Sequence, residues 1–444
     1  MNRNLIGEVW RLVVPVILQG LVITVVFFTD RLLIGQYSDT GLASMQISGP
    51  LMWSIFSVFN AFSAGTMAVI GRSVGAKDPQ RVRETLSSVL VLSLVVGVAV
   101  TCVGIGLRPW FADILASGSG SLEAQKMAVQ YMGATFLAVP FNLIQVCGVT
   151  ALQADGDTKT PMWISAITGL SNLLISWTLL WGHGPFPELG ILGAGIGSLA
   201  ALVIGSILVL AALWGRTGNS TLRPYSPPSL KALRPVLKLS GPAFGEKIVF
   251  HTAFVMFAAY VGHLGKISMA ANQALIAIES LGFIVAHAFS VASASMVAQK
   301  MGANEPEQAA AAGWISAGLG VAVLGTTGML FWFFPEALLR CFTSDPEIIA
   351  IGIPCLRLAA WVQPLMAMYE AMAGGLRGAG DTRTPMFAAF IGPGVIRLAL
   401  CWALAFHFEM GLYGIWVGTS IDWLVRVVIL TTVFHRGRWK RLQI

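Results

Sequence analysis

Acidic residues inside apolar stretches are the residues of this sequence best suited to chemistry. Asp30 lies in an apolar stretch of residues 11–35, and Glu246 lies four residues after Pro242 in another. A charge in the hydrocarbon core of a bilayer costs about 2.5 to 3.5 kcal/mol on insertion scales, so such residues are usually functional. A carboxyl group held among apolar side chains can exchange a proton, a sodium ion or an organic cation.

Each of these acids also has a structural interpretation. Asp30 at the headgroup boundary would simply be solvated, and Glu246 in a helix interior would accept structural hydrogen bonds. Asp422 and Arg426 are four residues apart, which is the spacing of an ion pair within one helix. We expect that pair to be structural, and we keep both interpretations open for Glu246.

The elements that position these residues are membrane-spanning helices. Apolar residues make up 56% of the 444 residues and charged residues only 11%, far from the composition of a soluble domain. A spanning helix needs about 20 apolar residues, and about twelve segments qualify, whereas barrel strands are shorter and alternate. The spans are 11–35, 44–70, 84–107, 127–151, 161–182, 190–214, 240–263, 271–298, 311–334, 348–374, 385–407 and 411–434.

The sequence contains the same unit twice. Four pairs of residues are each 227 positions apart: Pro15 and Pro242, Gly35 and Gly262, Gln46 and Gln273, and Gly75 and Gly302. We therefore predict lobes at 1–220 and 239–444, joined by a cytoplasmic linker at 221–238. Six helices per lobe is an even number, which predicts two six-helix bundles related by a pseudo-twofold axis, with a central cleft.

A turn motif also occurs once in each half, as GDTKTPM and GDTRTPM. Its equivalent residues are Gly156 and Asp157 in the first copy and Gly380 and Asp381 in the second. The glycines allow a tight turn, and we expect Thr160 and Thr384 to cap helices that begin at the following prolines. Pro15 and Pro242 are predicted to bend their helices, and bending at Pro15 is expected to respond to the charge on Asp30.

The distribution of basic residues predicts the orientation. With the N-terminus inside, about nineteen Lys and Arg residues lie on the cytoplasmic side and about four on the other. This predicts a plasma-membrane protein of the bacterial inner-membrane type with both termini in the cytoplasm. The net charge of +7 then reflects contact with the inner leaflet and not with nucleic acid.

The sequence lacks the common motifs of nucleotide hydrolysis and metalloproteolysis, so we expect no enzyme and no cofactor beyond a coupling ion. The five cysteines have no metal-ligand spacing, and we interpret them as packing residues without a structural metal.

Several longer stretches resemble the multidrug and toxic compound extrusion (MATE) family. They include TDRLLIGQYSDTGLAS from Thr29, LQADGDTKTPM from Leu152 and SVASASMVAQKMGA from Ser290. The likeness covers nearly the whole chain, and GPAFGEKIVF and IES favour the DinF-like, general bacterial branch over the NorM branch. The resemblance implies a twelve-helix antiporter that exports organic cations or amphiphilic drugs by alternating access in exchange for H⁺ or Na⁺.

The resemblance also implies which residues act. Asp30 corresponds to the main acid of the family, and Pro15 to the proline linked to it. The other polar groups of the family's amino-lobe cation site correspond to Asn172, Ser176 and Ser198. In the second half, the family's acid corresponds to Glu246. Position 176 is Ser where relatives often have Asp or Asn. A possible Na⁺ at Asp30 would thus have a poorer oxygen cage, which favours proton coupling.

A flippase for a lipid-linked precursor is the alternative, because the wider superfamily includes such proteins. It would need basic residues in the cleft, and Arg31, Arg357 and Arg397 are candidates. A channel or a membrane enzyme is less favoured. We expect a monomer that contacts a small substrate and membrane lipid.

Overall fold

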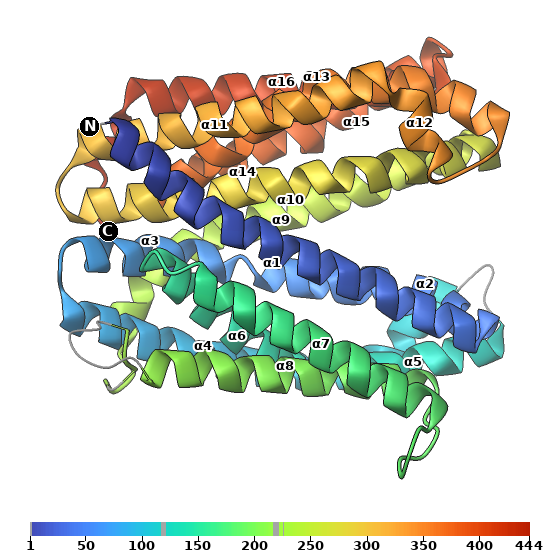
Figure 1. Cartoon of the computed structure of the whole chain (residues 1–444), viewed down its shortest axis with the longest axis horizontal. Coiled ribbons are helices and arrows are strands. Elements are labelled where there is room, and N and C mark those ends of the chain that lie inside the picture. Colours follow the sequence, from blue (N-terminus) through green and yellow to red (C-terminus); the bar gives the residue numbers. More distant parts are fainter. Residues whose placement is uncertain (1, 117–120, 216–221, 225) are drawn as a thin grey trace. The chain divides into compact units, whose positions relative to one another are not determined.

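A computed structural model of the chain describes residues 2–116, 121–215, 222–224 and 226–444, and every regular element in those ranges is a helix (Figure 1). The first half contains α1 (Asn2–Tyr37), α2 (Asp39–Phe59), α3 (Phe62–Gly75), α4 (Pro79–Ala116), α5 (Leu122–Leu137), α6 (Val139–Ala154), α7 (Lys159–Trp181) and α8 (Ile191–Trp214). The second half contains α9 (Leu230–His263), α10 (Lys266–Gly302), α11 (Pro306–Phe333), α12 (Pro335–Arg340), α13 (Pro346–Gly378), α14 (Arg383–Ala389), η1 (Phe390–Arg397), α15 (Leu398–Trp402), η2 (Ala403–His407), α16 (Gly411–Arg436) and η3 (Arg438–Arg441).

The predicted membrane fold is confirmed in these ranges. Eleven helices are long and apolar enough to cross a bilayer, and a twelfth span is formed if α5 and α6, which meet at a 45° bend, count as one. That bent pair coincides with the span predicted at 127–151. Ala138 joins the two helices, and Pro140 stands at the start of α6, where its missing N–H removes no helical hydrogen bond.

The chain forms two compact units. Unit 1 comprises Met1–Ile17, Met67–Lys77 and Leu237–Ile444, and unit 2 comprises Leu18–Thr66 and Asp78–Val236. Because α1 passes from unit 1 to unit 2 after Ile17, the predicted bending residue Pro15 lies two residues before this change. The proposed lobe boundaries at 220 and 239 stay a prediction. Within the predicted linker 221–238, residues 221 and 225 lie outside the described residues, and α9 begins at Leu230.

The two turn motifs fold alike, and they correct one expectation. Gly156 and Gly380 have φ values of 87° and 88°, in the left-handed region that favours glycine. The helices begin at Lys159 and Arg383, before the prolines, so Thr160 and Thr384 are not the caps.

The aspartate of each motif accepts the capping hydrogen bonds instead. The Asp157 carboxylate accepts from the Thr160 backbone N (3.0 Å) and hydroxyl (2.7 Å), and Asp381 accepts from the Thr384 backbone N (3.0 Å) and hydroxyl (2.6 Å). An acid suits this position because it accepts hydrogen bonds from otherwise unpaired N–H groups and interacts favourably with the positive end of the helix dipole.

The predicted span 385–407 is an interrupted helix. Two π-helical segments, η1 and η2, flank the short α15, and Pro393 lies inside η1. A proline cannot donate to the helical ladder, which favours a local change in the hydrogen-bonding pattern. The side chain of Arg397, the last residue of η1, is only 9% exposed.

Candidate functional site

Asp30 and Asn172 meet in unit 2 and form the centre of the candidate site. The Nδ2 of Asn172 lies 2.9 Å from each carboxylate oxygen of Asp30. The Oδ1 of Asn172 accepts from the hydroxyl (3.2 Å) and the backbone N (3.3 Å) of Ser198. With Asp30 ionised, the opposite amide orientation would set Oδ1 against the carboxylate, so we assign Nδ2 to the side of Asp30.

Three helices, α1, α7 and α8, carry these residues, and glycine brings them together. A Cβ at Gly169 of α7 would lie 2.7 Å from a methyl carbon of Val26, one turn before Asp30 on α1. A Cβ at Gly193 of α8 would lie 2.6 Å from the Leu179 backbone of α7. Small residues permit this close approach of membrane helices, so the contact of Asp30 with Asn172 depends on backbone packing.

Three further polar residues of unit 2, Ser176, Tyr131 and Gln19, are neutral. The Ser176 side chain is 2% exposed, its hydroxyl has no hydrogen-bond partner among the described residues, and it packs against Gly197. Tyr131 of α5 forms a side-chain hydrogen bond with Ser198 and interacts electrostatically with Asp30. Earlier on α1, Gln19 donates to the hydroxyl of Ser165 of α7 at 3.0 Å. The structure thus adds Tyr131 to the residues predicted from the sequence.

Asp30 has no ion-pair partner in the part of the chain that the structure describes. The guanidinium of the neighbouring Arg31 lies 4.2 Å from the ring centroid of Phe27, one turn earlier on α1. Adjacent helical residues face different directions, so Arg31 is not placed to pair with Asp30. Among the described residues, the contacts of the Asp30 carboxyl group are thus with the neutral Asn172 amide and, electrostatically, with Tyr131.

Glu246 has a charged partner in unit 1. Its Oε1 lies 2.5 Å from Nη2 of Arg377 near the end of α13, and their side chains are 10% and 20% exposed. Glu246 and Gln19 are equivalent in the repeat, so an ion pair replaces the neutral hydrogen bond of the first half. The sequence did not predict this partner, because Arg377 lies 131 residues away.

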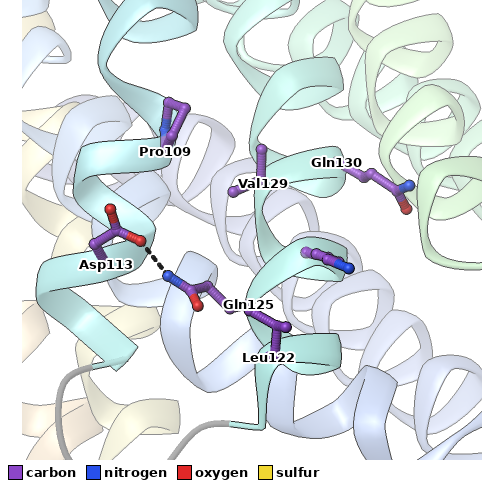
Figure 2. Close-up of a pocket in the computed structure, with 7 residues that line it drawn as sticks. Pro109, Asp113, Leu122, Gln125, Val129 and Gln130 are labelled. Atoms are coloured by element: carbon purple, nitrogen blue, oxygen red, sulfur yellow. Dashed lines mark hydrogen bonds between the residues drawn. The ribbon is translucent and has the colours of Figure 1, made fainter.

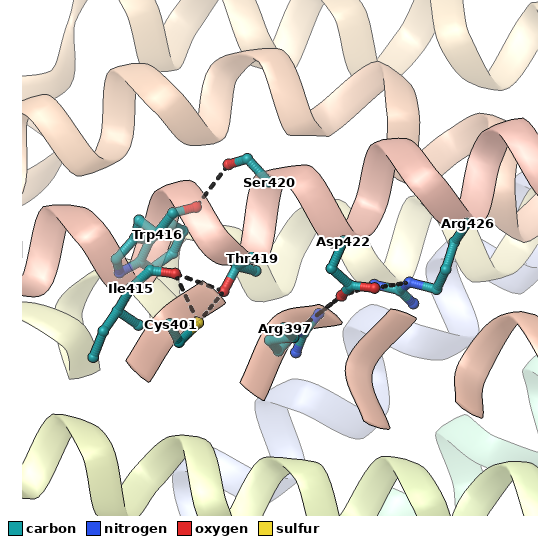
Figure 3. A network of polar contacts seen from close by, with 8 residues as sticks. All are labelled: Arg397, Cys401, Ile415, Trp416, Thr419, Ser420, Asp422 and Arg426. Carbon is teal, nitrogen blue, oxygen red and sulfur yellow. Dashed lines mark hydrogen bonds and ion pairs between the residues drawn. The ribbon is translucent and has the colours of Figure 1, made fainter. Parts of the chain in front are cut away.

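Asp422 forms the most buried charged cluster of unit 1 among the described residues (Figure 3). Its carboxylate, 0% exposed, accepts from Nε of Arg397 at 2.9 Å, and the Nη2 of Arg397 lies 2.7 Å away. It also accepts two bonds of 2.9 Å from Arg426, which confirms the predicted pair within α16. The Arg426 guanidinium in turn lies 3.8 Å from the ring centroid of Trp423.

The three basic residues considered for a lipid-binding cleft have different surroundings. Arg397 is paired with Asp422, Arg31 stacks on Phe27, and Arg357 is exposed on α13. None of the three forms an ion pair with Asp30 in the described ranges. The lipid-flippase alternative stays a prediction.

A depression near the ends of α4 and α5 is separate from this site (Figure 2). Its lining includes Asp113 and Gln125, which are hydrogen-bonded to each other. No residue of α1, α7 or α8 contributes to it. We attribute no function to this depression.

The cysteines do not form a metal site within the described residues, where no group of three metal-binding side chains is found. Cys147, Cys355 and Cys401 are buried, while Cys102 and Cys341 are exposed.

The chain is similar to the MatE family model over residues 15–178 and 242–403. The two matched ranges begin at Pro15 and Pro242, the first pair of the repeat, and together they cover more than half of the chain. The fold and the match define a membrane transporter. The chain belongs to the multidrug and toxic compound extrusion family.

Individual relatives are similar over almost their whole length. A probable multidrug resistance protein NorM of Thermotoga maritima is 27% identical over 440 residues, covering 98% of this chain and 93% of that protein. A probable multidrug resistance protein YoeA of Bacillus subtilis is 22% identical, with coverage of 98% and 96%. The names do not separate the DinF-like from the NorM branch, so that assignment stays a prediction.

Among solved structures, a MOP superfamily transporter from Pyrococcus furiosus has the same fold. It matches with a TM-score of 0.89 at 18% identity, covering 99% of this chain and 97% of the other. That protein is described as having a binding pocket of reverse polarity that suggests a different function. The shared fold by itself therefore does not fix the function.

Proposed function

We propose that this transporter exports organic cations or amphiphilic drugs in exchange for protons, with Asp30 as the carboxylate that both occupy in turn. The observation that supports this is the set of neutral partners around Asp30, whose carboxylate contacts Asn172 at 2.9 Å. A carboxylate without a basic partner keeps its attraction for a proton or a cation. The multidrug names of the relatives support the substrate class.

We favour proton coupling over sodium coupling because the candidate site offers few oxygen ligands. Sodium, like other hard cations, binds best where several oxygen atoms converge. Position 176, which the family resemblance assigns to the cation site, carries a hydroxyl group and not a second carboxylate. A proton needs no such set of ligands.

Pro15 supplies a place where α1 can respond to Asp30. The helix is continuous over 36 residues with Pro15 inside it, and a proline removes one hydrogen bond of the ladder. The helix belongs to unit 1 up to Ile17 and to unit 2 from Leu18. A change of bend at this point would alter access to Asp30, which is the coupling that alternating access requires. Pro242 occupies the equivalent position in α9.

Uptake of tetraphenylphosphonium into inside-out vesicles tests this proposal, with a proton gradient and a sodium gradient imposed separately. We expect uptake under the proton gradient, and its loss in Asp30→Asn. Uptake driven only by sodium would contradict proton coupling. No uptake under either gradient would contradict the antiporter and favour the lipid flippase, which an assay with fluorescent lipids would then test.

We further propose a monomer in the plasma membrane with both termini in the cytoplasm, as the basic loops predict. Labelling of single cysteines near each terminus with a membrane-impermeant thiol reagent in intact cells tests the orientation. Protection of both in cells and labelling after lysis is the expected result.

A further inference from the structure

The ends of α3 and α10 cross at two glycines that are equivalent in the repeat. A Cβ at Gly75 would overlap the carbonyl oxygen of Gln299 and lie 2.9 Å from its Cα. A Cβ at Gly302 would overlap the carbonyl oxygen of Arg72 and lie 2.8 Å from its Cα. Each glycine therefore touches the backbone three residues before the other, and the contact is reciprocal.

The two helix ends also stop in the same way. Arg72 O accepts from Ala76 N at 2.8 Å, and the equivalent Gln299 O accepts from Ala303 N at 2.9 Å. The next residues, Lys77 and Asn304, have φ values of 54° and 61°. A non-glycine residue with φ in the left-handed region is uncommon, because this backbone conformation is strained for it. Its presence in both copies shows that the two ends share one local geometry, the common left-handed helix end formed here without glycine.

Arg72 adds charged contacts at this crossing. Its Nη1 donates to Leu442 O at 2.8 Å, and its Nη2 donates to Ala379 O at 2.7 Å. Ala379 is the C-cap of α13 and stands directly before Gly380 of the second turn motif. A guanidinium is well placed at a helix C-terminus, where unpaired carbonyls and the negative end of the dipole gather. The equivalent residue, Gln299, carries no charge.

We propose that this crossing, with Arg72 as its latch, is the contact that holds the transport pathway closed on the side where the basic loops lie. The proposal rests on the proposed alternating-access transport. Residues 67–77 of the first repeat and residues 237–444 of the second belong to the same compact unit, so the two repeats are joined here. For the pathway to open on this side, equivalent helices of the two repeats must separate, and the crossing must break. Glycine at both positions lets the two backbones approach closely enough for a stable contact. The contact can still break when the helices separate.

Hydrogen–deuterium exchange of the full-length protein in nanodiscs tests the contact directly. Adding a methyl group at Gly75 or Gly302 forces the backbones apart, so Gly75→Ala and Gly302→Ala should each raise exchange by about tenfold at residues 76–80 and at 303–307. Gly106→Ala and Gly318→Ala are matched controls in helices, because a Cβ there meets nothing within 4 Å. A rise confined to the helix that carries the substitution, or an equal rise in a control, would overturn the proposal.

Arg72→Gln is a second variant that adds no volume and so is suited to the case in which the glycine variants do not fold. It should raise exchange around Gly380 and in the last residues of the chain, with Arg72→Lys between it and the wild type. Unchanged exchange at both places would rule out the latch.

Uptake of tetraphenylphosphonium separates this proposal from the proposed function. Raised exchange in the glycine variants of a protein that transports no cation would support the contact and contradict the antiporter. A glycine variant with raised exchange and wild-type uptake would show that the contact does not gate transport.

Discussion

The acids of the two repeats have different partners, although their helices are equivalent. In the first half, Asp30 faces an amide, and Gln19 forms a neutral hydrogen bond with Ser165. In the second half, Glu246 and Asp422 are both bound by guanidinium groups. The two halves thus share repeated sequence features but differ in the charges around their acids.

This difference separates two uses of a buried acid. A carboxylate paired with arginine is compensated, and removing it leaves an uncompensated positive charge. A carboxylate among neutral donors has no counter-charge to offset the free-energy cost of its burial. Protonation or a bound cation therefore lowers that cost. We therefore propose exchange for Asp30 and stabilisation for Glu246 and Asp422. Substitutions at five acids sharpen the comparison of the two halves, beginning with the largest expected effect on stability.

Asp422→Asn should destabilise the protein most. The substitution leaves Arg397 and Arg426 without their shared counter-charge in the core, which costs about 3 to 5 kcal/mol. The thermal unfolding midpoint of the purified protein measures this. Glu336→Gln is the control, because its partner Arg340 and Glu336 itself are 67% and 54% exposed, and such pairs contribute little. Equal midpoints for the two variants would contradict a structural role for Asp422.

Glu246→Gln should have a smaller effect of about 1 to 3 kcal/mol, because Arg377 keeps some access to solvent. A double-mutant cycle with Arg377→Gln isolates the pair, and the double variant should recover part of the lost stability. Transport should persist in any variant that folds. Loss of transport with unchanged stability would instead assign the coupling role to Glu246.

Asp157→Ala and Asp381→Ala should each cost about 1 kcal/mol, because each removes a helix cap. The two hydrogen-bonding patterns agree, so we expect the effects to agree within about 0.5 kcal/mol. Thermal unfolding of both variants beside the wild type gives the comparison. Clearly unequal losses would show that the repeated motif serves different roles in the two halves.

Asp30→Asn should have the smallest effect on stability, because no positive partner loses its counter-charge. We expect the unfolding midpoint to stay at or above that of the wild type. A loss comparable to that of Asp422→Asn would show that Asp30 is a structural acid, and would remove the difference between the two halves.

The sequence predicted those features that depend on local spacing or on repetition. The spans follow from apolar length, and the Asp422 pair with Arg426 follows from a four-residue spacing within one helix. The sequence did not predict that Arg377 and Arg397 bind Glu246 and Asp422, because these arginines come from other helices. The caps were assigned to Thr160 and Thr384 because each precedes a proline, but the helices start earlier and Asp157 and Asp381 take that role.

The proximity of Asp30 to Asn172 and Ser198 was implied by family resemblance and not by spacing, since these residues lie on three helices. Tyr131 was missed, because a tyrosine near the end of an apolar helix is common at a membrane interface. The equivalence of Gly75 and Gly302 was visible in the sequence, but their contact with each other was not, because a repeat does not show where its copies meet.

Proton release on binding of tetraphenylphosphonium tests the division between the two halves most directly. The purified protein is held in weakly buffered solution, and the protons that appear are counted for the wild type, Asp30→Asn and Glu246→Gln. If Asp30 exchanges a proton for the cation, the wild type and Glu246→Gln release up to about one proton per cation bound, and Asp30→Asn releases none. Release that survives in Asp30→Asn and disappears in Glu246→Gln would contradict the account.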